Sequence, residues 1–208
     1  TGTTTINAGA NNITFNNGDG TFGTLELTAI DVTVNEAAAT DIGASTIGGD
    51  ASFTSTGAVT DSGTIAITGT GTTTINAGTN NITLDNGDGT FGTLELTAID
   101  VTITENAATD IGASTIGGNA SFTSTGAITD SGNVSVTGNA SFQGTTITLG
   151  DASTADFGSI DFAGSGAVTI SDASATIVSG TSTAGAGLTL TSTSHITLAG
   201  AVTVVGDT

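Results

Sequence analysis

A long internal repeat constrains the fold of this chain more than any other feature of its sequence. Residues 1–69 return at 70–138 with 57 of 69 positions identical, so that Phe22 matches Phe91. Residues 139–208 form a third, diverged copy of the same pattern. A period this long and faithful is typical of stacked repeat architectures. We therefore expect one continuous stack of three copies, 1–69, 70–138 and 139–208, with no separate domain.

The composition of the copies predicts short strands joined by tight turns. The chain has 32 Gly and no Pro, and branched Thr, Val and Ile dominate its apolar and polar positions. Branched residues favour the extended backbone, Gly permits turns, and no window shows the spacing of an amphipathic helix. Alternation predicts that Thr, Glu and Asp point outward, and that these residues point inward: Leu25, Leu27, Val32, Val34, Ile65 and Ile67.

A second, shorter spacing indicates how the strands are arranged. The segment GNASF occurs at 118–122 and again at 138–142, which places Phe122 and Phe142 one 20-residue coil apart. Each copy holds about nine strand signals, and three strands per coil would give three coils of roughly 23 residues. We predict an all-β fold, a right-handed parallel β-helix (β-solenoid) of about nine coils spaced by about 4.8 Å.

The alternative fold is an antiparallel sandwich. It would be built on the Asn-Gly dipeptides Asn17-Gly18 and Asn86-Gly87, because that dipeptide favours hairpin turns. Such a fold needs a hairpin about every ten residues. Only one Asn-Gly dipeptide recurs per copy, which favours the solenoid.

The charge of the chain is one-sided and excludes several partners. The chain has nineteen acidic residues and no Lys or Arg. We therefore expect it to bind neither nucleic acid nor an anionic membrane surface. No segment has the roughly 18 apolar residues of a membrane span, and none has the pattern of a signal peptide. The chain also has no Cys. We expect a mature or excised section of something longer.

Several short motifs give the chain a family resemblance. The segments ITDSG, VTG, NNITL, FGTL and DIGAST recur through it, and together they resemble the repeats of very large exported bacterial surface proteins of the filamentous haemagglutinin-like class. The resemblance implies a right-handed parallel β-helix forming the shaft of an adhesin or fibre, located outside the cell or on its surface. It implies no catalytic residues. The total absence of Lys and Arg is stricter than that class requires.

One loop is a candidate cation site. Asp85 and Asp88 lie on a Gly-rich turn, Asp85-Asn86-Gly87-Asp88-Gly89, and closely spaced oxygen ligands of this kind suit Ca²⁺. Asp19 is the counterpart of Asp88 in copy one, where Asn16 replaces Asp85. The competing interpretation is a turn capped by its own side chains, because the distal Glu of a full calcium loop is missing. The sequence predicts no required cofactor and, at most, weak Ca²⁺ binding.

Catalysis is not predicted. Glycoside cleavage needs two carboxylates about 5 to 9.5 Å apart. The matched pairs Glu26/Glu95 and Glu36/Glu105 are separated by one whole copy of the repeat, which is too far. A local pair of Glu26 with Asp31 stays open, although solvated outward carboxylates are the default expectation. His195 is the single histidine and is expected to point outward, with no nucleophile or carboxylate partner that the sequence identifies.

The function that the sequence predicts is structural. We expect a β-solenoid section from an extracellular bacterial filament, adhesin stalk or matrix protein, and no enzyme. Neither end carries an obvious polar cap, so the ends would continue into further repeats or stack on identical subunits. The alternative is a ligand-binding or ice-binding adhesin module, because runs such as Thr72-Thr73-Thr74 could form flat arrays of Thr. Any host or surface receptor is unidentified.

Overall fold

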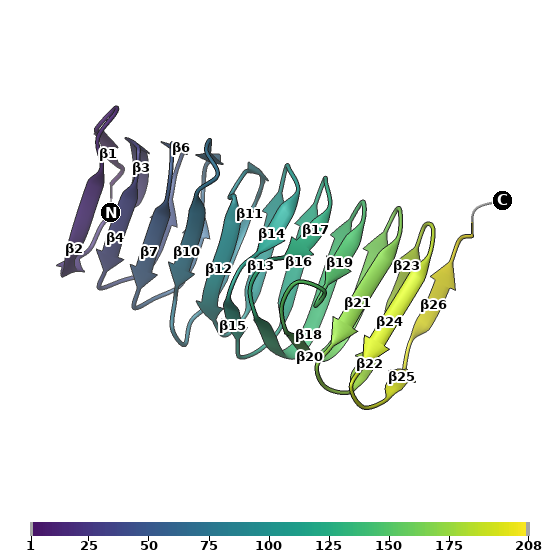
Figure 1. The fold of residues 1–208 in the computed structure, drawn as a ribbon. Helices are drawn as coiled ribbons and strands as arrows, with labels where there is room; N and C mark the ends of the chain where they lie inside the picture. Colours follow the sequence, from purple (N-terminus) through teal and green to yellow (C-terminus); the bar gives the residue numbers. More distant parts are fainter. Residues whose placement is uncertain (1, 207–208) are drawn as a thin grey trace.

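The fold is a solenoid of parallel β-strands. The computed structural model describes residues 2–206, and of Asp19 and Asp88 it describes the backbone only. All strand pairings in this part of the chain are parallel, which excludes the antiparallel sandwich. The strands follow one another along a rod whose two ends carry the first and last strands (Figure 1).

The strands are short and are joined by brief turns. Their bounds are β1 Thr4–Asn7, β2 Ile13–Gly20, β3 Thr24–Ala29, β4 Val32–Glu36, β5 Thr40–Ile42, β6 Ser45–Ile47, β7 Ala51–Ser55, β8 Val59–Asp61, β9 Ile65–Ile67, β10 Thr72–Asn76, β11 Ile82–Gly89, β12 Thr93–Ala98, β13 Val101–Glu105, β14 Thr109–Ile111, β15 Ser114–Ile116, β16 Ala120–Ser124, β17 Ile128–Asp130, β18 Val134–Gly144, β19 Ile147–Leu149, β20 Ala155–Gly164, β21 Val168–Asp172, β22 Thr176–Val178, β23 Thr181–Ala184, β24 Leu188–Ser192, β25 Ile196–Leu198 and β26 Ala201–Val204. Copy one therefore contains the nine strands that its sequence predicts.

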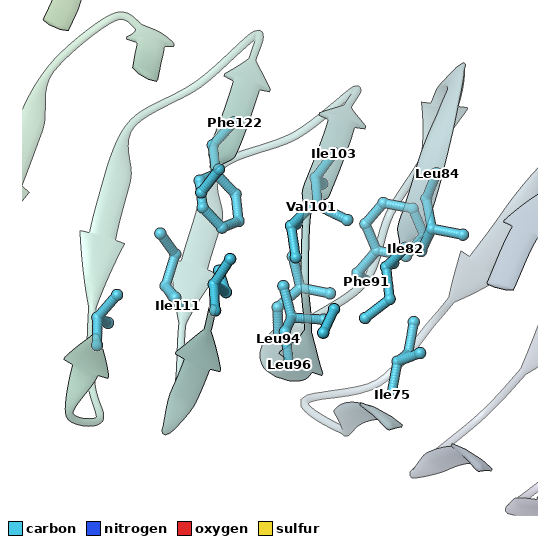
Figure 2. Packing of buried hydrophobic residues seen from close by; sticks show 14 of the residues in the cluster. Ile75, Ile82, Leu84, Phe91, Leu94, Leu96, Val101, Ile103, Ile111 and Phe122 are labelled. Carbon is cyan, nitrogen blue, oxygen red and sulfur yellow. The ribbon is translucent and has the colours of Figure 1, made fainter. Parts of the chain in front are cut away.

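The interior is a thin apolar core produced by the alternation of each strand. The six residues of copy one that were predicted to point inward are all buried, as are Phe53, Phe122 and Phe142. Phe122 pairs directly with Phe142, and their rings stack with centroids 5.8 Å apart at 6°. Leu84 of β11, Ile103 of β13 and Phe91, from the turn between β11 and β12, point into the interior (Figure 2). The spacing of the two GNASF segments is thus one coil.

The coils follow the 20-residue spacing of the GNASF segments and are slightly shorter than the roughly 23 residues expected from three coils per copy. Stacked residues pair Ile13 with Val32, Val32 with Ala51 and Ala51 with Thr73, so three coil steps lead from position 13 to position 73. Coils of about 20 residues give about ten turns in place of nine. The figure of 23 residues differs because one 69-residue copy of the repeat does not contain a whole number of coils.

Successive copies consequently face different sides of the rod, because a copy exceeds three coils by close to half a coil. The corresponding strands β4 and β21 lie in one column of stacked strands, which runs through β7, β10, β12, β14, β17 and β19. Their counterpart in copy two, β13, lies in another column with β8, β11, β16 and β18. Identical side chains therefore alternate between faces along the axis.

Candidate functional site

The predicted calcium loop forms an outward bulge in β11. Leu84 pairs with Ile103 and Gly89 with Glu105, so five residue steps on β11 span two steps on its partner. Gly87 takes a positive φ of 83°, which only Gly adopts readily. The backbone N–H of Asp85 donates to a carboxylate oxygen of Asp61 at 3.0 Å, and burial raises the pKa of Asp61. A turn held by side-chain to backbone bonds accounts for this geometry.

Calcium binding at this loop stays a prediction. The side chains of Asp19 and Asp88 lie outside the described residues. Asp85 is described and exposed. Among the side chains whose positions are described, no three His, Cys, Asp or Glu residues come together as a metal site would require.

The outward carboxylates are bound by hydroxyl groups of the neighbouring coils. Asp41 accepts from the hydroxyls of Thr24 at 2.6 Å and Ser62 at 2.9 Å, one on the coil before it and one on the coil after. Asp110 repeats this arrangement in copy two. Glu26 likewise accepts from Thr5 at 2.8 Å. The chain has no Lys or Arg, so these carboxylates accept hydrogen bonds from Thr and Ser hydroxyls in place of the charged side chains that pair with carboxylates in other proteins.

His195 points outward, as predicted. Its side chain is exposed in the turn before β25, and Nδ1 lies 3.1 Å from the Ser194 hydroxyl. The hydroxyl of the neighbouring Ser192 donates to the His195 carbonyl oxygen at 3.1 Å. These contacts order the turn.

Among the side chains that the structure describes, four carboxylates are buried, which corrects the prediction that Asp and Glu all point outward. Glu36, Glu105, Asp130 and Asp172 each expose 4 % or less of their surface. Alternation could have identified the first of them, because Val32, Val34 and Glu36 share one parity along β4 and therefore one face. They were expected to point outward with the other Glu and Asp residues, because solvated outward carboxylates are the usual arrangement.

Glu105 shows how a buried carboxylate is accommodated without a cation. Its Oε1 accepts the backbone N–H of Phe91 at 2.8 Å, and its Oε2 accepts the Thr109 hydroxyl at 2.8 Å. Glu36 makes the same two kinds of bond in copy one. Burial raises the pKa of Glu105, and the two hydrogen bonds oppose that shift. The carboxylate fastens the end of the bulged loop to the corner of the solenoid.

The third copy changes this corner. Asp172 takes the place of Glu105, and Thr176 takes that of Thr109 four residues later. The shorter Asp172 uses Oδ1 for the Ser174 N–H at 3.0 Å, while Asp172 Oδ2 and Thr176 Oγ1 are buried without a hydrogen-bond partner. The Glu105 carboxylate therefore has hydrogen-bond partners for both of its oxygens. At the corresponding corner of copy three, the side chain is shorter by one methylene group, and two buried polar atoms have no partner.

A ladder of Asn and Asp runs along another corner. The Oδ1 of Asn12 accepts the N–H of Asp31, that of Asp31 accepts the N–H of Asp50, and that of Asp50 accepts the N–H of Thr72, at 2.9 to 3.2 Å. In copy two Asn119 replaces Asp50 and makes the same bond. The ladder satisfies backbone donors where the strands turn.

The first coil of the rod is incompletely covered. Phe22 and Ile6 are half-buried, whereas their counterparts Phe91 and Ile75 are fully buried. The difference lies in the preceding coil, because Ile75 pairs with Phe53 of copy one. Two closely similar sequences are therefore more fully covered in copy two than in copy one. Hollows lie beside Phe22 in this open coil, one of about 400 Å³.

The last coil is open in the same way. Within the described chain, β24, β25 and β26 each pair with a strand on one side only. Ile196, Leu198 and Val204 expose 44 %, 60 % and 46 % of their surfaces. The two open coils lie at opposite ends of the rod (Figure 1).

Comparison with known families assigns the chain to a family of repeats. Repeats of unknown function (DUF5649) match residues 29–97 and 98–162, which together make up more than half of the chain. The chain belongs to this family of repeats. The first match has the length of one period of the sequence. No curated protein and no solved structure matches the chain. No helix in residues 2–206 is long and apolar enough to cross a membrane.

Proposed function

We propose that the chain is a section of the shaft of an extracellular bacterial filament, adhesin stalk or matrix protein, similar in role to filamentous haemagglutinin-like repeats. The observation that carries this proposal is the continuous stacking of the interior coils. β16 pairs with β13 of the coil before it and with β18 of the coil after it, and Phe122 stacks on Phe142 of the next coil. Coils packed in this way form a stack that further coils can extend without changing the packing inside it.

The mechanism of such a shaft is mechanical. Each interior coil is held by parallel backbone ladders on both sides and by an apolar core that continues from coil to coil. The absence of Lys and Arg leaves trypsin-like proteases no cleavage site. Both properties suit a rod that works outside the cell.

Surface labelling of intact cells tests the proposed location and role. We expect antibodies against the outer face of residues 82–136 to label thin projections on unpermeabilised cells of the organism that makes the protein, when viewed by electron microscopy. Labelling that requires permeabilisation would contradict a surface shaft. An antibody against a cytoplasmic protein is the matched control.

A single observation favours a second candidate, an ice-binding face. Thr129, Thr148, Thr169 and Thr189 occupy the same outward position in four successive coils. The column is one residue wide and is preceded by Asp110, which pairs with Thr129. Thermal hysteresis measurements test it: an ice binder would lower the freezing point in a way that Thr148→Lys and Thr169→Lys abolish. An unchanged freezing point would remove this candidate.

A further inference from the structure

We propose that Asn86, in the bulge of β11, is a site of spontaneous deamidation, in which water and the backbone of the chain convert the side-chain amide to a carboxylate. The reactive pair is Asn86 and the glycine that follows it, Gly87. The inference goes beyond the proposed function and does not depend on it, because it concerns a chemical change within one loop of the rod.

The reaction needs the backbone nitrogen of Gly87 to reach the side-chain carbonyl carbon of Asn86. The nitrogen loses its proton to solvent base and forms a bond to Asn86 Cγ. The Cγ–Nδ2 bond breaks, and Nδ2 takes up a proton and leaves as ammonia, so that a five-membered cyclic imide remains. Water then opens the ring at either carbonyl carbon, which gives an aspartate side chain or an isoaspartyl linkage. Water is the only co-reactant, and nothing is oxidised or reduced.

The bulge places the nitrogen of Gly87 between the paired stretches of β11. The strand pairs with β13 at residues 82–84 and again at Gly89. Its pairing with β8 covers residues 82–83. Asn86 and Gly87 are both exposed. Solvent base can therefore reach the nitrogen of Gly87, and the reaction does not require a paired position to open.

The surroundings of Gly87 leave room for the imide ring. Outside its chain neighbours, the atoms nearest to a Cβ position built on Gly87 are Thr104 Cγ2 at 3.9 Å and the Asp85 carbonyl oxygen at 4.0 Å. The backbone before Asn86 is held, because the Asp61 carboxylate accepts the N–H of Asp85 at 3.0 Å. The chain is thus anchored on one side of Asn86 and has space on the other, where the ring forms.

Asparagines in the ladders are held in a way that opposes the same reaction. Asn81 Oδ1 accepts the N–H of Asp100 at 3.2 Å. The N–H of Ile82, whose nitrogen would have to attack Asn81, donates to the Asp100 carbonyl oxygen at 2.9 Å. Asn133 Oδ1 likewise accepts a backbone N–H, at 3.1 Å. The ladder therefore protects these side chains, whereas the bulge exposes Asn86.

The product changes the surface of the rod while leaving its stacking intact. Deamidation adds one negative charge to a chain whose net charge is −19, and it does so beside the exposed Asp85. The isoaspartyl product also lengthens the main chain by one carbon atom. The bulge can take up this length, because five residue steps there already span two steps on the partner strand.

Mass spectrometry of the aged protein tests the site. The folded chain is incubated at mildly alkaline pH, then unfolded and cleaved after glutamate, so that Asn86 is read in the peptide of residues 37–95. We expect position 86 to lose its amide at least about tenfold faster than Asn81 in the same peptide. Asn86→Gln should abolish the change at this position, because the longer side chain does not close a five-membered ring.

Ala120→Gly is the matched control, because it creates another Asn-Gly pair, at Asn119, inside the ladder. Position 120 pairs with Val101 on one coil and with Ala140 on the next. In the folded variant Asn119 should react at least about tenfold more slowly than Asn86, and in guanidinium chloride the two should react alike. Equal rates in the folded variant, or an Asn86 that reacts only in guanidinium chloride, would overturn the inference. The second outcome is measured in the wild type and holds even if Ala120→Gly does not fold.

Discussion

Individual carboxylates in this chain are held by hydroxyl and backbone donors because the sequence supplies no Lys or Arg. Thr and Ser from adjacent coils bind Asp41 and Asp110 on the outside, and Phe91 with Thr109 binds Glu105 inside. Each such bond contributes stability only while its coil stays in register with the next. The polar side chains therefore reinforce the same stacking that the backbone ladders produce.

Glu105 makes the stability of the fold depend on pH. Burial raises its pKa, so the folded chain binds this proton more tightly than the unfolded chain does. The contribution of this group is complete below its ordinary pKa of 4.5 and is lost as the pH rises through the raised folded value. Glu105→Gln should remove this pH-dependent contribution to stability. As the pH rises, the unfolding free energy of the wild type should therefore fall relative to that of the variant. Urea unfolding across pH 4 to 8 measures it, and parallel profiles would contradict the assignment.

Asp172→Glu should stabilise the third copy. The added methylene group lets the carboxylate reach Thr176, as Glu105 reaches Thr109 at 2.8 Å, and satisfies two buried atoms that now have no partner. We expect a gain of about 1 kcal/mol in unfolding free energy. Glu105→Asp is the reciprocal control and should destabilise. A loss of stability in Asp172→Glu would show that the corner lacks space for the longer side chain.

At the scale of the strand ladder, stacking places like charges next to each other. Asp31 and Asp50 are successive members of the Asn and Asp ladder, and copy two has Asn119 where copy one has Asp50. Asp50→Asn keeps the acceptor for the Thr72 N–H and removes the repulsion. It should raise stability by about 0.5 kcal/mol, more at low salt. Thermal unfolding at two salt concentrations tests this, with Asn119→Asp expected to act in the opposite direction.

The elements were predictable from the sequence to the extent that local alternation determines them. The inward residues of β3 and β4 and the pairing of Phe122 with Phe142 follow directly from periodicity. The coil length follows from the 20-residue spacing of the GNASF segments. It does not follow from the length of a copy, because the period of the repeat is not a whole number of coils. The burial of Glu105 was not predicted, although alternation places it on the inward face with Val101 and Ile103. Its donors, Phe91 and Thr109, could not be identified from the sequence, because only the folded corner brings them together with Glu105.

At the scale of the whole molecule, net charge acts against the compact rod. With 19 acidic residues and no Lys or Arg, self-repulsion should destabilise the fold most at low ionic strength. The melting temperature should therefore rise with added NaCl, most steeply up to about 0.1 M, where the Debye length falls to about 10 Å. If Ca²⁺ and Na⁺ raise the melting temperature equally at matched ionic strength, screening of the acidic charges accounts for the effect. A specific effect of Ca²⁺, lost in Asp85→Asn, would instead support the predicted calcium loop.

The register of stacked coils is the claim on which the account of the whole molecule depends, and a pair of engineered disulfides tests it most directly. Thr102 and Ser121 are outward partners on adjacent coils. Thr102→Cys/Ser121→Cys should close an intramolecular disulfide rapidly on mild oxidation. Thr102→Cys/Thr125→Cys, whose thiols would be stacked only in a solenoid with longer coils, should not. Faster closure of the second pair than of the first would contradict the solenoid described above.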